Sequence, residues 1–164
     1  MTLPSIRLTN LLLASASLVL ILIALFMQYQ MDLPPCPLCI SQRVAFITAG
    51  TFCFIAFLHA PKQWGHRVYA GLSALILAGG AALASRQLWL QSLPEDQVPA
   101  CGPSIEYMIS NFPLSEALSV LLQGDGNCAE VVWTFLGLSI PGWTLVAFIG
   151  LILINIWQML RKPA

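Results

Sequence analysis

Four long apolar runs without Asp, Glu, Lys or Arg dominate the pattern of the chain. They extend over residues 11–29, 44–60, 68–85 and 143–160. A helix that crosses the hydrocarbon core of a bilayer needs about 20 residues, and each run comes close to that length. Because backbone amides find no water inside a bilayer, each run should be helical. The pattern predicts an all-α membrane protein, a four-transmembrane-helix bundle with helices at about these positions.

Composition supports this interpretation. Of the 164 residues, 58% are hydrophobic and only 9% are charged, whereas soluble domains carry about 25% charged residues. The first apolar run is longer than the core of a secretory signal peptide, and no small-residue cleavage site follows it. We therefore expect residues 11–29 to be retained as the first membrane helix.

Charged residues separate between the two faces of the predicted bundle. The N-terminus, the 61–67 connection and the C-terminus carry the basic residues Arg7, Lys62, Arg67, Arg161 and Lys162. The positive-inside rule makes this face cytoplasmic, with both termini inside. All seven acidic residues fall in the opposite segments, about 30–42 and 87–142. Arg43 and Arg86 lie at the outer boundary, where for Arg86 we favour an interfacial role.

Two further patterns predict how segments lie. In the second outer segment one helical face is apolar, which predicts a short interfacial helix on the membrane or on the end of the bundle; its residues are Leu114, Leu118, Leu121 and Leu122. In the third apolar run, small residues recur every four positions, which predicts a face that packs inside the bundle. These are Ala70, Ala74, Ala78 and Ala82.

Four of the five cysteines lie in the outer segments, as Cys36 with Cys39 and Cys101 with Cys128. Disulfides persist on the outer side of a bacterial-type membrane. Three pairings are possible, and adjacency favours Cys36–Cys39, which leaves Cys101–Cys128. Cys53, in the middle of the second apolar run, is assigned no role.

The surroundings of Cys39 indicate redox chemistry. A helix that begins near Cys39 places this thiol in its first turn, where unpaired amides favour a thiolate. Arg43, four residues later, lies on the same helical face and adds a positive charge. Cys36, outside the helix, is expected to lack both aids. The pair should thus be asymmetric, with Cys39 toward the membrane and Cys36 toward incoming thiols.

Two other uses of the cysteines were considered. A four-cysteine zinc site usually supplies its second pair as another closely spaced knuckle, but 26 residues separate Cys101 from Cys128, and His59 and His66 lie outside the outer segments. No metal is therefore expected. Static disulfides that pin the loops of a structural membrane protein stay open as a non-enzymatic alternative.

Several motifs together resemble one family. They are Pro35-Cys36-Pro37-Leu38-Cys39 with Gln42-Arg43, the Cys101/Cys128 loop, Asn127-Cys128-Ala129-Glu130 with Trp133, and Phe135-Leu136-Gly137-Leu138 leading to Pro141 and Trp143. From the first span nearly to the end, the chain resembles the disulfide bond formation protein B (DsbB) family, quinone-dependent thiol oxidants of the bacterial inner membrane. A vitamin K epoxide reductase-like protein would carry its cysteine pairs in the opposite order.

The resemblance implies a single DsbB-like membrane domain over residues 1–164. In this domain, ubiquinone or menaquinone from the membrane pool would oxidise Cys36 and Cys39. Arg43 would match the family arginine implicated in quinone function and bind this cofactor. Cys101 and Cys128 would exchange with a periplasmic DsbA-type thiol oxidase, Cys101 forming the mixed disulfide. The lipid bilayer is the other expected partner, and no nucleic acid is expected. Some members carry a histidine after the arginine that ends the third span; here the region reads Gln87 to Gln91, with Gln91 as a polar stand-in.

Overall fold

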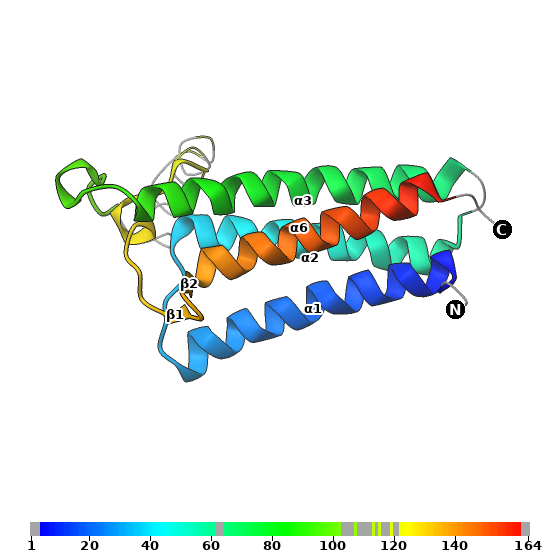
Figure 1. Cartoon of the computed structure of the whole chain (residues 1–164), viewed down its shortest axis with the longest axis horizontal. Coiled ribbons are helices and arrows are strands. Elements are labelled where there is room, and N and C mark those ends of the chain that lie inside the picture. Colours follow the sequence, from blue (N-terminus) through cyan, green and yellow to red (C-terminus); the bar gives the residue numbers. More distant parts are fainter. Residues whose placement is uncertain are drawn as a thin grey trace.

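The computed structural model describes residues 4–61, 64–102, 107, 113, 115, 119 and 122–161. Within this part of the chain, four helices lie side by side in an elongated bundle (Figure 1): α1 (Ile6–Gln30), α2 (Pro37–His59), α3 (Trp64–Gln91) and α6 (Ile140–Leu160). Each of them is long and apolar enough to cross a membrane. The predicted four-helix membrane bundle is confirmed.

The helices extend beyond the apolar runs at the end of the bundle that carries the cysteines. The second helix begins at Pro37 rather than near residue 44, because Cys36 caps it and proline suits its first position. The third continues to Gln91 rather than ending near residue 85, since the residues after Arg86 include good helix formers such as Gln and Leu. As a result, Cys39, Arg43 and Gln87 all lie on helices.

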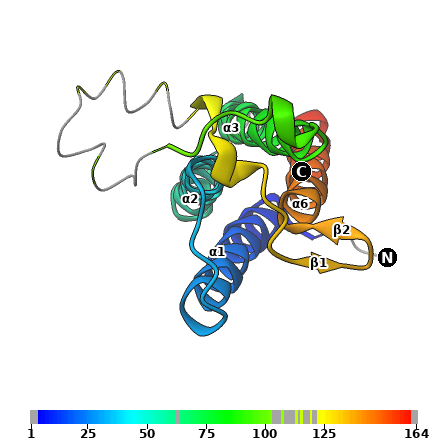
Figure 2. The same cartoon turned by 90° about the vertical axis from the view of Figure 1, so that its left-hand side faces the viewer.

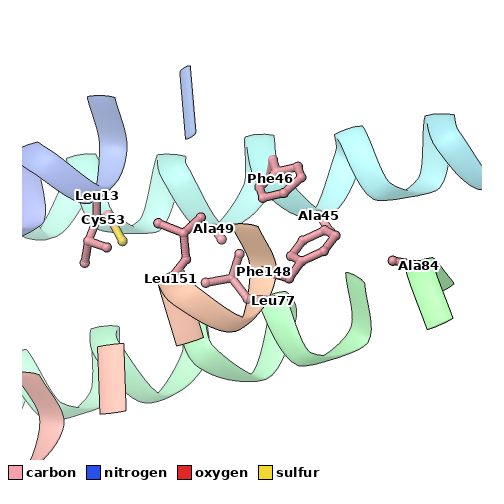
Figure 3. Packing of buried hydrophobic residues seen from close by; sticks show 9 residues of the cluster. All are labelled: Leu13, Ala45, Phe46, Ala49, Cys53, Leu77, Ala84, Phe148 and Leu151. Carbon is pink, nitrogen blue, oxygen red and sulfur yellow. The ribbon is translucent and has the colours of Figure 1, made fainter. Parts of the chain in front are cut away.

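The helices pack in the order α1, α2, α3, α6 around the bundle (Figure 2), with α2 between α1 and α3, and α6 against α3. The core is apolar at mid-height, where the rings of Phe46 and Phe148 stack with centroids 4.0 Å apart. Leu77 and Leu151 lie on the Phe148 side of this cluster, and Leu13 lies further along the bundle beside Cys53 (Figure 3). Both ends of the chain lie at the end of the bundle opposite the hairpin that precedes α6 (Figure 1).

The predicted alanine stripe on α3 is only partly correct. Ala70 is buried, but Ala78 and Ala82 are exposed. Positions four apart on an α-helix differ by about 40° around its axis, so a strict four-residue repeat drifts away from the bundle. The buried line mixes steps of three and four residues and consists of His66, Ala70, Ser73, Leu77, Gly80, Ala84, Gln87 and Leu90.

The connection between α3 and α6 contributes short elements at the cysteine-bearing end. They are the 3-10 helices η1 (Glu95–Gln97) and η2 (Gly126–Cys128) and the antiparallel strands β1 (Thr134–Phe135) and β2 (Leu138–Ser139). η2 lies against α2 and α3 (Figure 2). The predicted interfacial helix on Leu114, Leu118, Leu121 and Leu122 lies outside the described residues except for Leu122, as do Lys62 and Lys162.

Candidate active site

Cys36 and Cys39 form the first turn of α2. Cys36 has an extended backbone and is the N-cap of the helix, followed by Pro37 at the first helical position. Its Sγ accepts a hydrogen bond from the Cys39 backbone N–H at 3.4 Å. The two sulfur atoms lie 2.7 Å apart in hydrogen-bond contact, and both cysteines are free thiols. This close turn suits a pair that can form and break a disulfide.

The position of Cys36 corrects one expectation. Cys36 was expected to lack help from the helix N-terminus, but its sulfur receives one of the unpaired helix amides, the Cys39 N–H. The reason is the start of α2 at Pro37, which turns the preceding cysteine into the capping residue. The helix N-terminus therefore serves Cys36 as well as the Cys39 end of the pair.

Cys128 joins this pair from η2. Its side chain is buried and hydrogen-bonds to Cys36, and the backbone N–H of Leu38 donates to its sulfur. Leu38 and Leu90 form a buried apolar cluster with Cys128, and Cys36 packs against it. The chain reaches this position through Gly124, whose φ of +76° is a left-handed conformation, and a Cβ there would lie 2.6 Å from Leu38 Cδ1. Glycine is therefore required for this approach.

The contacts of Cys128 make it the more acidic of the two thiols. The hydrogen bond with Cys36 lowers the pKa of Cys128, against the effect of burial, and the Leu38 N–H lowers it further. The same contact with Cys128, together with that to Cys39, raises the pKa of Cys36. Between these two thiols, the contacts therefore favour the thiolate on Cys128 over that on Cys36, and the thiolate is the form that attacks disulfides.

Cys101 lies apart from these three sulfurs and is exposed. Its segment is fastened to η2 by two bonds: Gly126 N–H donates to Ala100 O at 3.3 Å, and Gly102 N–H donates to Asp125 Oδ2 at 3.1 Å. A Cβ on Gly126 would lie only 3.1 Å from Cys101 Sγ. Cys101 is thus a neighbour of the residue two positions before Cys128, at the surface.

Arg43 follows Cys39 by one helical turn and is directed toward α1. Its guanidinium donates to Ala24 O at 3.2 Å and to the Gln28 side-chain oxygen. Both acceptors are neutral, so these contacts leave the positive charge of Arg43 uncompensated. Two of its five N–H donors are used in this way.

Gln87 is a site residue that sequence reasoning missed. Its buried amide Nε2 lies 3.3 Å from Cys36 Sγ and 3.4 Å from Cys39 Sγ, and its Oε1 accepts from Gln42 Nε2 at 2.8 Å. The apolar run that ends at Ser85 placed Gln87 in the outer connection. Gln87 follows Ala84 by three residues, so in a continuous helix the two share one face. That spacing is the signal that could have placed Gln87 among the buried residues of α3.

Three other residues singled out in the sequence lie outside this cluster. Gln91, the expected polar stand-in, accepts from Ser139 Oγ at 2.8 Å and does not contact the cysteines. Arg86 is exposed and lies 4.4 Å over the ring of Trp89. Cys53 is buried in the apolar core, where its thiol donates to Ser73 Oγ at 3.6 Å (Figure 3).

Comparison with known proteins decides the family. Residues 6–158 match the family model described as Disulfide bond formation protein DsbB. The chain belongs to the DsbB family. It is 60% identical over 140 residues to disulfide bond formation protein B of Hahella chejuensis, with 85% of each chain covered. It is 55% identical over 160 residues to the protein of the same name from Saccharophagus degradans, which covers 98% of this chain and 96% of that one.

Membership of the DsbB family makes the chain a multi-pass membrane protein of disulfide bond formation, with oxidoreductase activity. A third relative, disulfide bond formation protein B of Stutzerimonas stutzeri, is 51% identical over 146 residues, 89% of this chain and 90% of that one. The family match decides against a vitamin K epoxide reductase-like protein and against a purely structural one. Among the described residues, Cys36, Cys39 and Cys128 bring three thiols into contact in this DsbB-family fold.

Proposed function

We propose that the protein reoxidises a periplasmic DsbA-type thiol oxidase and passes the electrons to ubiquinone or menaquinone. It would do so in the bacterial inner membrane, with both termini cytoplasmic and Cys36, Cys39, Cys101 and Cys128 facing the periplasm. The observation that carries this proposal is the contact of Cys36 with both Cys39 and Cys128. One sulfur thereby links the loop cysteines to the pair at the membrane boundary.

The first exchange takes place at the exposed cysteine. A thiolate of the DsbA-type partner attacks Cys101 of a Cys101–Cys128 disulfide; a mixed disulfide with Cys101 forms and Cys128 leaves with the electron pair. Exchange is faster when the leaving thiol is more acidic. The lowered pKa of Cys128, caused first by its hydrogen bond with Cys36, suits it as the leaving group.

The second exchange moves the electrons to α2. The Cys128 thiolate attacks Cys36 of a Cys36–Cys39 disulfide, so that the Cys36–Cys128 bond forms and Cys39 leaves as a thiolate. The partner's second thiolate then releases Cys101, which attacks Cys128 and frees Cys36. The partner has gained a disulfide, and Cys36 and Cys39 hold the two electrons.

The residues beside Cys39 fit a quinone. A quinone ring offers carbonyl oxygens as acceptors, and Arg43, whose described acceptors are neutral oxygens, has further N–H donors one turn after Cys39. Arg43 would therefore hold the ring, with Cys39 as the neighbouring thiol. When bound, the quinone supplies the electron acceptor, taking up two electrons and two protons as Cys36 and Cys39 form their disulfide.

Energetics favour a strong final oxidant. DsbA has a reduction potential near −120 mV, and ordinary structural disulfides lie below about −300 mV. At about 1.4 kcal/mol for each 30 mV, an ordinary disulfide would oxidise DsbA only uphill by on the order of 8 kcal/mol. A quinone supplies the missing driving force.

Quinone dependence can be tested on the purified, reduced protein. Adding quinone should remove the Cys36 and Cys39 thiols rapidly, as followed by thiol labelling and mass spectrometry. Arg43→Ala should slow this loss by roughly 10- to 100-fold, the worth of a hydrogen bond to a charged group. Arg86→Ala is the matched control, because this arginine lies at the same boundary and its described partners are Gln123 O and the Trp89 ring. Thiol loss that does not depend on quinone would contradict the proposal.

The partner can be tested by trapping. With Cys128→Ser, Cys101 should hold the DsbA-type oxidase as a mixed disulfide on a non-reducing gel, because the thiol that completes the loop disulfide is missing. Cys53→Ala should leave turnover unchanged. If no adduct forms while quinone chemistry is intact, the partner has been misidentified.

A further inference from the structure

We propose that Gln87 is a functional residue of the Cys36/Cys39 pair, whose amide N–H groups donate to both reduced sulfurs and stabilise negative charge on Cys39, and that Gln42 is a positioning residue that fixes this amide. The proposal rests on the proposed exchange function of the pair. It adds a hydrogen-bonding group from α3 to a site otherwise built from α2 and η2.

The geometry gives each sulfur a donor. A glutamine amide carries two N–H donors on one nitrogen, and Gln87 Nε2 lies 3.3 Å from Cys36 Sγ and 3.4 Å from Cys39 Sγ. Only 3% of Gln87 is exposed. Away from water, hydrogen bonds to charged groups are stronger than in solution. The amide therefore favours the thiolate over the neutral disulfide sulfur, which is the weaker acceptor.

Gln42 determines which end of the Gln87 amide faces the sulfurs. An amide rotated by half a turn would present its oxygen to them, and that oxygen would repel a thiolate. Gln42 Nε2 donates to Gln87 Oε1 at 2.8 Å and holds the oxygen toward α2. Gln42 is itself only 3% exposed, so water does not compete for this bond.

The same amide accommodates a protonated Cys39. Cys39 Sγ lies 3.7 Å from Gln87 Oε1, within reach as a thiol donor. The oxygen thus accepts from the thiol and the nitrogen donates to the thiolate, without a change in the position of α3. When Cys128 attacks Cys36 and Cys39 leaves with the electron pair, the Gln87 N–H already faces the sulfur that gains the charge.

The reduction equilibrium of the pair is the sharpest test, because a merely structural role would not move it in one direction. The full-length protein, purified without quinone, is equilibrated with glutathione buffers, and the Cys36/Cys39 disulfide is quantified by thiol labelling. Gln87→Met removes the donors at similar length. Because the reduced form loses its stabilisation, we expect the equilibrium to shift toward the disulfide by about tenfold, as for one charge-assisted hydrogen bond.

Matched variants sharpen this test. Gln42→Met should shift the equilibrium in the same direction by less, since the donors remain but are no longer held. Gln91→Met, which changes an amide one turn further along α3 that bonds Ser139 rather than sulfur, should match the unsubstituted protein. Gln87→His keeps an N–H donor and should lie closer to the unsubstituted protein than Gln87→Met does.

An unchanged equilibrium in folded Gln87→Met, or the same shift in Gln91→Met, would overturn the proposal. If Gln87→Met fails to fold, as judged by thermal unfolding in detergent, Gln42→Met carries the same test, and an unchanged equilibrium in it would overturn the proposal. The assay contains neither quinone nor a DsbA-type partner. A failure of the proposed function would therefore appear in the quinone and trapping experiments and leave this measurement interpretable.

Discussion

Cys101 and Cys128 belong to the same connection between α3 and α6, yet they lie in opposite environments. Cys101 is exposed at the surface, whereas Cys128 is buried on the N-terminus of α2 with a backbone amide and a second thiol as partners. Position along the chain does not distinguish them, but environment does. The exposed sulfur suits a protein partner, and the buried one suits transfer within the molecule.

The difference arises from how the loop packs. Gly124 brings the chain down onto Leu38, and η2 then directs Cys128 toward Cys36. The Cys101 segment lies over Gly126 and is held there by a backbone bond from Gly126 to Ala100 and by the bond of Gly102 N–H to the Asp125 carboxylate. Cys101 is thus kept at the surface beside Gly126, while Cys128 is buried against Cys36.

The strongest test of this difference is which loop cysteine can bond to Cys36. In the double variant Cys39→Ser with Cys101→Ser, mild oxidation should join Cys36 to Cys128 almost completely, because the two thiols are already in contact. In Cys39→Ser with Cys128→Ser, Cys36 and Cys101 should remain largely unpaired. The products are separated by maleimide gel shift. Equal yields in the two variants would show that burial does not select Cys128.

A smaller effect on loop disulfide formation is expected when the Cys101 segment is displaced from Gly126. A Cβ on Gly126 would lie 2.5 Å from Pro99 O and 3.1 Å from Cys101 Sγ, so Gly126→Ala must displace the Cys101 segment. Overpacking of this kind costs about 1–3 kcal/mol. The Cys101–Cys128 disulfide should form roughly tenfold more slowly in glutathione buffer, as measured by thiol labelling.

Gly150→Ala is the control for this substitution, because no described atom outside the helix backbone lies within 4 Å of the added Cβ. It should leave the rate of loop disulfide formation unchanged. If Gly126→Ala formed the Cys101–Cys128 disulfide at the rate of the unsubstituted protein, the position of Cys101 beside Gly126 would not matter for this reaction.

The smallest expected effect is a shift in pH dependence. In the reduced protein the pKa of Cys128 is lowered, chiefly by the hydrogen bond with Cys36, so its thiolate persists below the usual thiol range and is lost only as the pH falls through the lowered pKa. In Cys36→Ala this cause is absent, and the pH midpoint for iodoacetamide labelling of Cys128 should move upward. Mass spectrometry of the Cys128 peptide measures it; an unchanged or lower midpoint would contradict the assigned cause.

The fold could be predicted because its signals are local. Runs of about twenty apolar residues report on the bilayer, and charge separation predicts an orientation for the bundle. Spacing and position also indicated the four cysteines to which we assign the proposed exchange. The contact between Cys36 and Cys128 could not be predicted, because it depends on a loop turning at Gly124 and meeting the first turn of α2.

Gln87 shows a second limit. Polar residues end an apolar run, so the sequence placed Gln87 outside the membrane helix, although α3 continues past it to Gln91. Its partner Gln42 was noted as part of a motif, but the bond between the two amides joins residues 45 positions apart. Only packing of α2 against α3 brings them together. The prediction that the alanine stripe of α3 packs inside the bundle was only partly correct for a related reason. Residue type alone did not reveal that positions four apart rotate around the helix and away from the bundle.

When a cysteine is the N-cap of a helix, the strength of the capping hydrogen bond depends on the chemical state of its sulfur. Serine or aspartate at the start of a helix is a constant acceptor, whereas the acceptor strength of Cys36 changes whenever its sulfur is a thiolate, a thiol or half of a disulfide. In the proposed cycle, the capping bond from the Cys39 N–H would be strongest with a Cys36 thiolate and weakest with a disulfide. The Leu38 N–H in the same turn donates to Cys128 Sγ. The oxidation state of Cys36 would therefore also affect the hydrogen bond that Cys128 receives.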